Sequence, residues 1–153
     1  MLTRVRAEVP QGVTYGDVTG LFADAGARVI ATDIDEARLA ALCEQHPTVV
    51  TVAGDVATPE GADALIAAAG NRLDVLCNNA ALIEATVLEE TDEALWDEVI
   101  RVNLTGPFLL SKRALPLMLE GGGGAIVNTG SPPRFVATAA GLPTQPGSTV
   151  CLG

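Results

Sequence analysis

Asp33 is the residue whose type and position offer the clearest chemistry in this chain. It ends a β-branched run at residues 28–32 and precedes a helical pattern at 36–44. In a dinucleotide site, a carboxylate at the end of a strand accepts hydrogen bonds from ribose hydroxyls and repels a 2′-phosphate, so Asp33 is a candidate for selecting NAD. The alternative is that Asp33 or Asp35 only caps the following helix. Considered without the other motifs, this segment favours the interpretation as a cap.

Two further polar sequences follow β-branched runs, and a third lies within a long helical segment. AGDV contains Asp55 and Val56, and LDVLCNNAA contains Asn79 and Ala80, while Asn103 belongs to VNLTG. The alternatives are that the Asn pair forms only a turn and that Asn103 is a polar kink in a helix.

The elements that must position these residues alternate between short strands and longer helices. β-branched runs predict strands at 28–32, 48–53, 73–77 and 125–129. Ala- and Leu-rich stretches predict helices at 36–44, 59–69 and within 92–119, where Asp92 can serve as the cap. This alternation is typical of βαβ units. We predict an α/β fold, an incomplete doubly wound parallel sheet (Rossmann-like) of four or five strands with helices on both faces.

Composition limits the function classes. Of the 153 residues, 48% are hydrophobic and only 3% aromatic, which suits a parallel sheet buried on both faces. The net charge of −10 opposes the phosphate neutralisation on which nucleic-acid binding depends. No apolar run approaches the roughly 20 residues of a membrane span, and residues 1–15 lack the apolar centre of a signal peptide. We therefore expect a cytoplasmic protein with no nucleic-acid or membrane partner.

The three cysteines predict neither a metal site nor a disulfide framework. Cys43, Cys77 and Cys151 are widely spaced and odd in number. We expect Cys43 and Cys77 to line the core as small hydrophobic residues, with free-thiol chemistry as the alternative.

In this order and spacing, the motifs resemble those of the short-chain dehydrogenase/reductase family. Members of that family carry an acidic strand end, then D-V, then N-N-A-G, and the likeness continues through V-N-L-T-G and I-V-N-T-G-S as far as Ser131. It covers about two thirds of the chain. The resemblance implies that Asp33 holds the adenosine ribose, that Asp55 and Val56 flank the adenine, and that Asn79 with Ala80 supports the cofactor backbone.

The same resemblance implies two catalytic positions. Asn103 matches the Asn that holds a proton-relay water through a local helix distortion, and Ser131 matches the Ser that hydrogen-bonds the substrate oxygen. In this chemistry a Tyr transfers the proton while hydride moves to or from nicotinamide, and a Lys four residues later lowers the pKa of the Tyr.

Both ends of the chain depart from the family pattern. The family's Tyr and Lys fall at Thr144 and Ser148, and neither residue can replace them. The segment 132–153 holds four prolines and is predicted to be an irregular tail after a dinucleotide-binding domain at 1–131. Codons permit a neighbouring reading frame in this tail that encodes Tyr and, four residues later, Lys, so a frameshift would explain the loss.

The first unit of the fold, residues 1–25, looks degraded. The family's T-G-x-x-x-G-I-G lets the backbone approach the cofactor pyrophosphate, and here only Gly12 and Gly16 supply a G-x-x-x-G. We expect these two glycines in a loop, with cofactor binding as their implied role. Residues 3–9 alternate polar and apolar side chains, so the buried central strand is missing or replaced.

The resemblance as a whole implies an NAD-dependent oxidoreductase by descent, with NADP less favoured, acting on a small alcohol or ketone. Because the catalytic Tyr and Lys are absent, we expect a truncated pseudoenzyme with little or no activity. The alternatives are a non-catalytic binding or interaction fragment and a decayed, frameshifted gene product. Exposed sheet edges also make a homo-oligomer or self-association an expectation.

Overall fold

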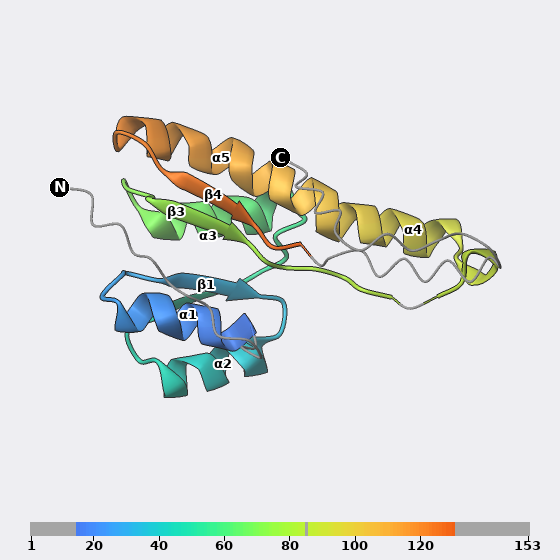
Figure 1. Cartoon of the computed structure of the whole chain (residues 1–153), viewed down its shortest axis with the longest axis horizontal. Helices are drawn as coiled ribbons and strands as arrows, with labels where there is room; N and C mark the ends of the chain where they lie inside the picture. Colours follow the sequence, from blue (N-terminus) through green and yellow to red (C-terminus); the bar gives the residue numbers. More distant parts are fainter. Residues whose placement is uncertain (1–14, 85, 131–153) are drawn as a thin grey trace, which may run out of the picture.

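The computed structural model describes residues 15–84 and 86–130 of the chain. Helices and parallel strands alternate along it (Figure 1). The α-helices are α1 (Tyr15–Asp24), α2 (Glu36–Gln45), α3 (Pro59–Ala69), α4 (Glu93–Ile100) and α5 (Gly106–Glu120). The strands are β1 (Ile30–Asp33), β2 (Val50–Ala53), β3 (Val75–Asn78) and β4 (Ala125–Asn128). A 3₁₀ turn, η1 (Leu88–Glu90), precedes α4, and a π-helical turn, η2 (Arg101–Thr105), joins α4 to α5.

Side-chain caps explain where three helices begin. Asp35 accepts hydrogen bonds from the backbone amides of the first turn of α2, Thr58 accepts one from Gly61 N, and Asp92 accepts one from Leu95 N. Each cap satisfies a backbone donor that has no partner within the helix. Asp92 is thus confirmed as the cap of its helix.

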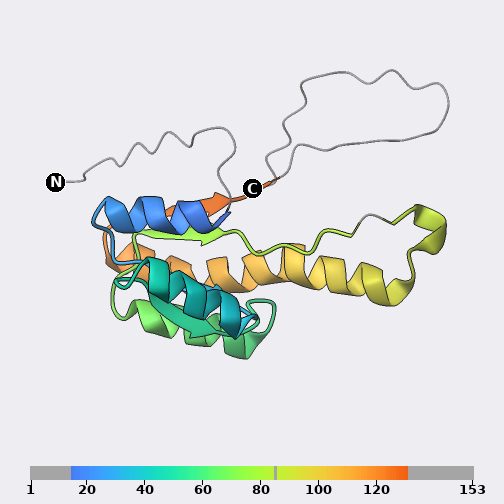
Figure 2. The ribbon, with the colours of Figure 1, turned by 90° about the horizontal axis from the view of Figure 1, so that it is seen from below.

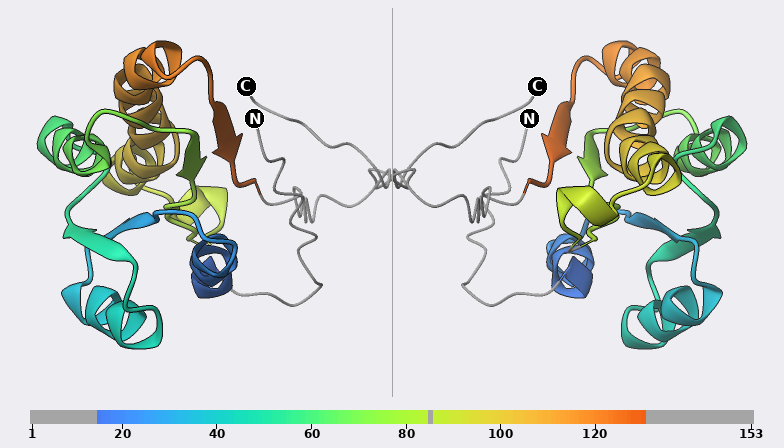
Figure 3. Two further views of the ribbon diagram at one scale, coloured as in Figure 1. Left: turned by 90° about the vertical axis from the view of Figure 1, so that its left-hand side faces the viewer. Right: turned by 90° about the vertical axis from the view of Figure 1, so that its right-hand side faces the viewer.

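The four strands form two parallel pairs in place of one continuous sheet. β1 pairs with β2 from Ile30 opposite Val50, and β3 pairs with β4 from Val75 opposite Ala125. The end views show the order β2, β1, β3, β4, with a gap between β1 and β3 (Figure 3). Within the described residues no strand bridges this gap, and the segment 3–9, considered above for the central position, lies outside them.

Helices cover both faces of the strands, as predicted. α3 and α5 lie on one side, and α1 and α2 lie on the other (Figure 3). The core lies between β3, α3 and α5, where α5 contributes a buried row spaced every four residues. The members of this core cluster are Val56, Ala62, Leu76, Leu110, Ala114 and Met118. The incomplete doubly wound α/β fold is therefore confirmed.

Two local predictions were wrong. The sequence around Gly16 was expected to be a loop, yet Gly16 lies in α1, whose helical pattern is hidden by two glycines and a β-branched Val18. Cys77 was expected in the core, but its side chain is exposed because Leu76 and Asn78, on the opposite face of β3, are the residues that turn inward. Cys43 is half-buried beside Thr51, and Cys151 lies outside the described residues.

Among the described residues, no helix combines the length and the apolar character that crossing a membrane requires.

Candidate functional site

Asp33 lies where the sequence placed it, at the carboxyl end of β1. One of its carboxylate oxygens accepts a hydrogen bond from Asp35 N at 2.9 Å. Asp35, and not Asp33, is the residue that caps α2. The second oxygen of Asp33 points toward the guanidinium of Arg38, 3.9 Å away. Asp33 is therefore positioned by the backbone and keeps a partly exposed carboxylate at the strand end.

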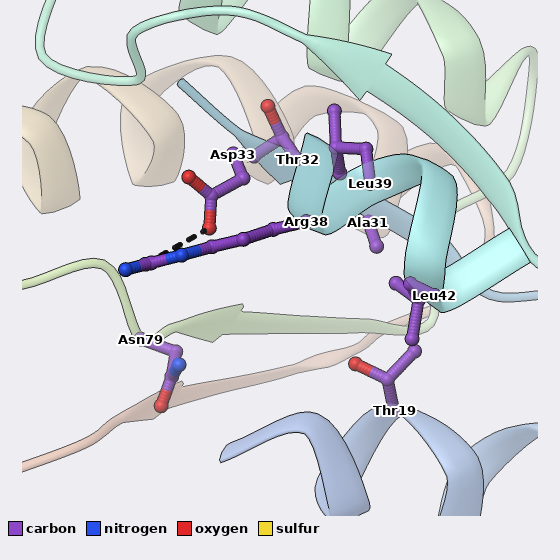
Figure 4. Close-up of a pocket in the computed structure, with 8 residues that line it drawn as sticks. All are labelled: Thr19, Ala31, Thr32, Asp33, Arg38, Leu39, Leu42 and Asn79. Atoms are coloured by element: carbon purple, nitrogen blue, oxygen red, sulfur yellow. Dashed lines mark ion pairs between the residues drawn. The ribbon is translucent and has the colours of Figure 1, made fainter. Parts of the chain in front are cut away.

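A pocket of about 270 Å³ opens beside Asp33, in the gap between the two strand pairs (Figure 4). Its lining residues come from α1, β1, α2 and the end of β3, and they are Thr19, Ala31, Thr32, Asp33, Arg38, Leu39, Leu42 and Asn79. The crossover from β1 to β2 runs through α2, while those from β2 to β3 and from β3 to β4 run on the other face. The pocket therefore lies at the topological switch point, where doubly wound sheets bind their ligands.

Asp55 belongs to an ion-pair network that the sequence did not reveal. Its carboxylate accepts hydrogen bonds from Ala57 N at 2.9 Å and from the Arg101 guanidinium at 2.6 Å. Glu98 pairs with the other nitrogens of Arg101 at 2.6 and 2.7 Å. The hydrogen bonds that Arg101 donates to Glu98 and Asp55 raise the pKa of Arg101 above its usual value, and the guanidinium lowers the pKa of Glu98. This network ties the end of β2 to the π turn.

Of Val56, Asn78 and Asn79, only Asn79 lines the pocket, while the other two side chains are buried. The Val56 side chain is buried in the hydrophobic cluster, so only its backbone can face a ligand. Asn78 is buried and donates to Asn128 Oδ1 at 2.8 Å, which links β3 to β4. Asn79, the next residue, lines the pocket, and Ala80 is exposed beside it. The Asn pair is thus more than a turn, since one member braces the strands and the other reaches the pocket.

Asn103 lies in the middle of the π turn, so the expected local helix distortion is present. Its amide makes two hydrogen bonds of 2.8 Å with one residue of the loop after β3: Oδ1 accepts from Leu82 N, and Nδ2 donates to Leu82 O. A π turn inserts one residue into a helix and often marks a functional position. The paired hydrogen bonds fix the loop that follows Asn79 and Ala80 against the helix.

The structure brings only part of the predicted site together. Asp33 and Asn79 share the pocket, whereas Asp55 and Asn103 are joined to neighbouring segments by Arg101 and Leu82. Gly16 lies in α1, and Gly12 and Ser131 lie outside the described residues, as do Thr144 and Ser148.

Two arginines of the site were missed because neither belongs to a motif. Arg38 is five residues from Asp33 in sequence, but the first turn of α2 returns it to the strand end. Arg101 is forty-six residues from Asp55, and its i,i+3 spacing from Glu98 was the only signal available in the sequence.

Asp33 ends β1 beside an open pocket, and Asn103 fixes the loop that follows Asn79. This arrangement is suited to binding the adenosine ribose of a dinucleotide. Comparison with known proteins agrees with this chemistry. A family model described as short chain dehydrogenase matches residues 16–142. The chain belongs to the short-chain dehydrogenase family. The family's parallel Rossmann-like fold accounts for the strand order.

Individual relatives show the same likeness. The D-threitol dehydrogenase of Mycolicibacterium smegmatis is 33% identical over 127 residues, covering 78% of this chain and 49% of that protein. The 2-keto-3-deoxy-L-fuconate dehydrogenase of Xanthomonas campestris is 38% identical over 122 residues, covering 74% of this chain and 40% of that protein. The chain therefore spans about half the length of the curated relatives that it matches.

Solved structures give a consistent result. A short-chain dehydrogenase from Streptomyces avermitilis superposes with a TM-score of 0.67 at 30% identity, over 72% of this chain and 42% of that one. Serine dehydrogenase from Escherichia coli gives a TM-score of 0.67 at 28% identity, over 74% of this chain and 55% of that one.

Proposed function

We propose that the chain binds a nicotinamide cofactor, NAD in preference to NADP, and descends from enzymes that transfer hydride between nicotinamide and a small alcohol or ketone. The observation that carries the proposal is the partly exposed Asp33 carboxylate at the mouth of the pocket between β1 and β3. Membership of the family implies a nicotinamide cofactor, and Asp33 supports the choice of NAD.

The described residues suit the adenosine half of such a cofactor. The pocket has an apolar wall from Ala31, Leu39 and Leu42, and two of its polar groups, Asp33 and Asn79, lie at the carboxyl ends of β1 and β3. Apolar walls with a few convergent polar groups are usual for cofactor sites. When bound, the nicotinamide ring supplies the hydride acceptor or donor.

The chain's own residues take the remaining roles. Asp33 accepts hydrogen bonds from the ribose hydroxyls, and Asp55 with the backbone of Val56 borders the adenine. Asn79 and Ala80 support the cofactor backbone, while Gly12 and Gly16 belong to the pyrophosphate region. Asn103 acts as a positioning residue, because both groups of its amide are bound to Leu82. Ser131 hydrogen-bonds the substrate oxygen.

We also propose that catalysis is impaired, since Thr144 and Ser148 replace the family's Tyr and Lys. The family match ends at residue 142, one residue before Pro143, where the neighbouring reading frame can encode Tyr. This supports a change of reading frame near residue 142, within the tail at 132–153 that follows the cofactor domain at 1–131. A cytoplasmic location follows from the proposed use of a soluble cofactor.

Cofactor titration tests the proposal. By calorimetry we expect NADH to bind at least about tenfold more tightly than NADPH, because like charges about 4 Å apart repel by ~1 kcal/mol in water and by several kcal/mol near a protein surface. Asp33→Ala should narrow the difference between the affinities for NADH and NADPH. Asp74→Ala, which removes an exposed acid paired with Arg72, is the matched control and should leave it unchanged. Equal affinities of the unmodified protein for the two cofactors would contradict the assigned role of Asp33.

A second role, self-association, is favoured by an apolar stripe along the α4–α5 rod, which extends beyond the strands (Figure 2). Its large side chains are each at least half exposed, and they are Trp96, Leu104, Phe108, Leu115 and Leu119. On a straight α-helix Trp96 would lie away from the others, and the wider π turn brings it into line. Exposed apolar surface of this kind marks interaction sites.

The partner that fits the stripe is a second copy of this chain in antiparallel orientation. With Leu104 at the two-fold axis, Trp96 of one copy lies near Lys112 of the other, because each is eight positions from 104 and the extra residue of the π turn changes this register by only about one position. Lys112 already lies 5.8 Å from the centre of the Phe108 ring, so Trp96 and Asp97 of the second copy would meet a cation. A parallel pair would instead bring Lys112 against Lys112.

Light scattering after gel filtration tests this role. The unmodified protein should dimerise, and Leu104→Glu should yield a monomer, because two carboxylates would meet at the axis. Leu88→Glu, at another highly exposed leucine outside the stripe, should remain dimeric. A monomer at high micromolar concentration would refute the proposed dimer.

A further inference from the structure

Arg101 lies in the π turn against the end of β2, and the proposed function gives it no role. Its guanidinium donates to Asp55 Oδ2 at 2.6 Å and to both carboxylate oxygens of Glu98, at 2.6 and 2.7 Å. The side chains of Arg101 and Asp55 are only 35% and 33% exposed. Charge-assisted hydrogen bonds of this kind are strong and directional. Arg101 therefore holds the Asp55 carboxylate in one orientation.

This orientation leaves acceptor positions free on Asp55. Oδ1 accepts a hydrogen bond from Ala57 N at 2.9 Å, and Oδ2 accepts one from Arg101. A carboxylate offers about four lone-pair positions, so these two partners do not exhaust it. A ligand group that donates a hydrogen bond can fill a remaining position, whereas a second acceptor placed there would be repelled.

Asp55 also lies beside the proposed ribose site. In the parallel pairing of β1 with β2, Asp33 is opposite Ala53, and Gly54 N donates to Asp33 O at 3.1 Å. Asp55 follows directly after Gly54. Because the base of a nucleoside is bonded directly to its ribose, a carboxylate this close to Asp33 is placed to contact the base.

The charge of Arg101 separates two carboxylates. Hydrogen bonds from Arg101 lower the pKa of Glu98, and the nearby charge of Asp55 acts in the opposite direction, so Asp55 and Glu98 repel each other. Without the guanidinium, this repulsion would no longer be compensated, and Asp55 Oδ2 would lose its hydrogen-bond donor. The carboxylate would then turn away from Glu98 and lose its fixed orientation.

We propose that Arg101 is a positioning residue for recognition of the base: it holds the Asp55 carboxylate where it accepts a hydrogen bond from the amino group of adenine and repels a base with a carbonyl oxygen in that place. The inference rests on the proposed function, in which Asp55 borders the adenine. Because Arg101 acts through Asp55, the two residues contribute to base selectivity in a coupled, non-additive way.

Calorimetric titration with NADH and with reduced nicotinamide hypoxanthine dinucleotide tests this role. In the second ligand a carbonyl oxygen replaces the adenine amino group, while the ribose, pyrophosphate and nicotinamide parts are unchanged. The unmodified protein should bind NADH roughly tenfold or more tightly than the hypoxanthine ligand, because the latter loses a hydrogen bond to a charged acceptor.

Arg101→Gln should reduce this affinity ratio to less than about threefold, since Asp55 is no longer held in place. The loss should come from weaker binding of NADH, and the affinity for the hypoxanthine ligand should change by less than about threefold. A role of Arg101 in stability alone would weaken the binding of both ligands alike and leave the ratio unchanged. Asp55→Asn should also reduce the ratio, and adding Arg101→Gln to it should reduce the ratio no further.

Arg101→Lys is a second, milder variant, because it keeps a positive charge between the two carboxylates but lacks the planar fork of the guanidinium. Its ratio should lie between those of the unmodified protein and Arg101→Gln. Arg113→Gln is the matched control: Arg113 pairs with Asp63 and so joins α5 to α3, a long-range ion pair like that of Arg101. It should preserve the ratio of the unmodified protein.

If Arg101→Gln and Arg101→Lys both keep the ratio of the unmodified protein, the role of Arg101 is overturned. Equal affinities of the unmodified protein for the two ligands also overturn it, while the binding of NADH still supports the proposed function. If the unmodified protein binds neither ligand, the proposed function itself fails, together with the inference that rests on it.

Discussion

Steady-state assays with NAD(H) and secondary alcohols or ketones should give turnover at least ~10²- to 10⁴-fold below that of family members with an intact Tyr and Lys. A positioned general acid/base contributes about this factor, and the electrostatic support of the Lys adds to it. Thr144 has no phenol to titrate, and Ser148 has no positive charge to lower the pKa of one. The measurement is the rate of NADH absorbance change over a panel of alcohols and ketones.

Ser131→Ala is the control for this assay. If the acid/base step is absent, removing the hydroxyl should leave the residual rate within about threefold, because the effects of residues that act as a unit are not additive. Normal family-like turnover that disappears in Ser131→Ala would show that another residue supplies the proton.

Gly61→Ala should lower the free energy of unfolding by about 3 kcal/mol, at the upper end of what overpacking costs. Gly61 lies in the first turn of α3, and a Cβ there would collide with the carbonyl oxygen of Asp55 and come within 2.6 Å of its carbonyl carbon. The obstacle is backbone, which cannot rotate away as a side chain can. Such a loss is a large fraction of the roughly 5–15 kcal/mol that stabilises a domain.

Urea denaturation measures this change, with Gly54→Ala as the control. A Cβ at Gly54 would make only an ordinary contact of 3.5 Å with Gly61 Cα. That variant should stay within about 1 kcal/mol of the unmodified protein. Equal stabilities for the two variants would mean that the turn around Asp55 moves freely to accept the methyl group.

Local sequence patterns predicted the elements after α1 closely. α3 occupies the expected residues 59–69, and α2 extends the expected 36–44 by one residue. Both begin at polar caps, a short-range signal that can be seen in one dimension. The four strands also appear where β-branched runs occur, each shifted by up to two residues.

Long-range relations were harder to predict. Burial of Cys77 was expected from its apolar run, but burial depends on which face of β3 the other elements cover. Arg38 and Arg101 meet their partners only after the chain has folded, and arginines on helices are usually solvated. The division into two strand pairs likewise depends on hydrogen bonding between segments distant in sequence. These features follow from topology, which single-residue patterns do not encode.

The π turn between α4 and α5 makes the orientation of this segment sensitive to the deletion of a single residue. Because a π turn carries one residue more than the α-helix around it, deleting a single residue there would restore an unbroken α-helix at little cost in backbone hydrogen bonds. In the resulting continuous helix, α4 would be rotated by about 100° relative to α5. Arg101 and Asn103 would then swing away from Asp55 and Leu82, their partners in the native structure. A deletion of one codon would therefore preserve folding while separating the loops of Asp55 and Leu82 from the helix, a change that helix content measured by circular dichroism would not detect.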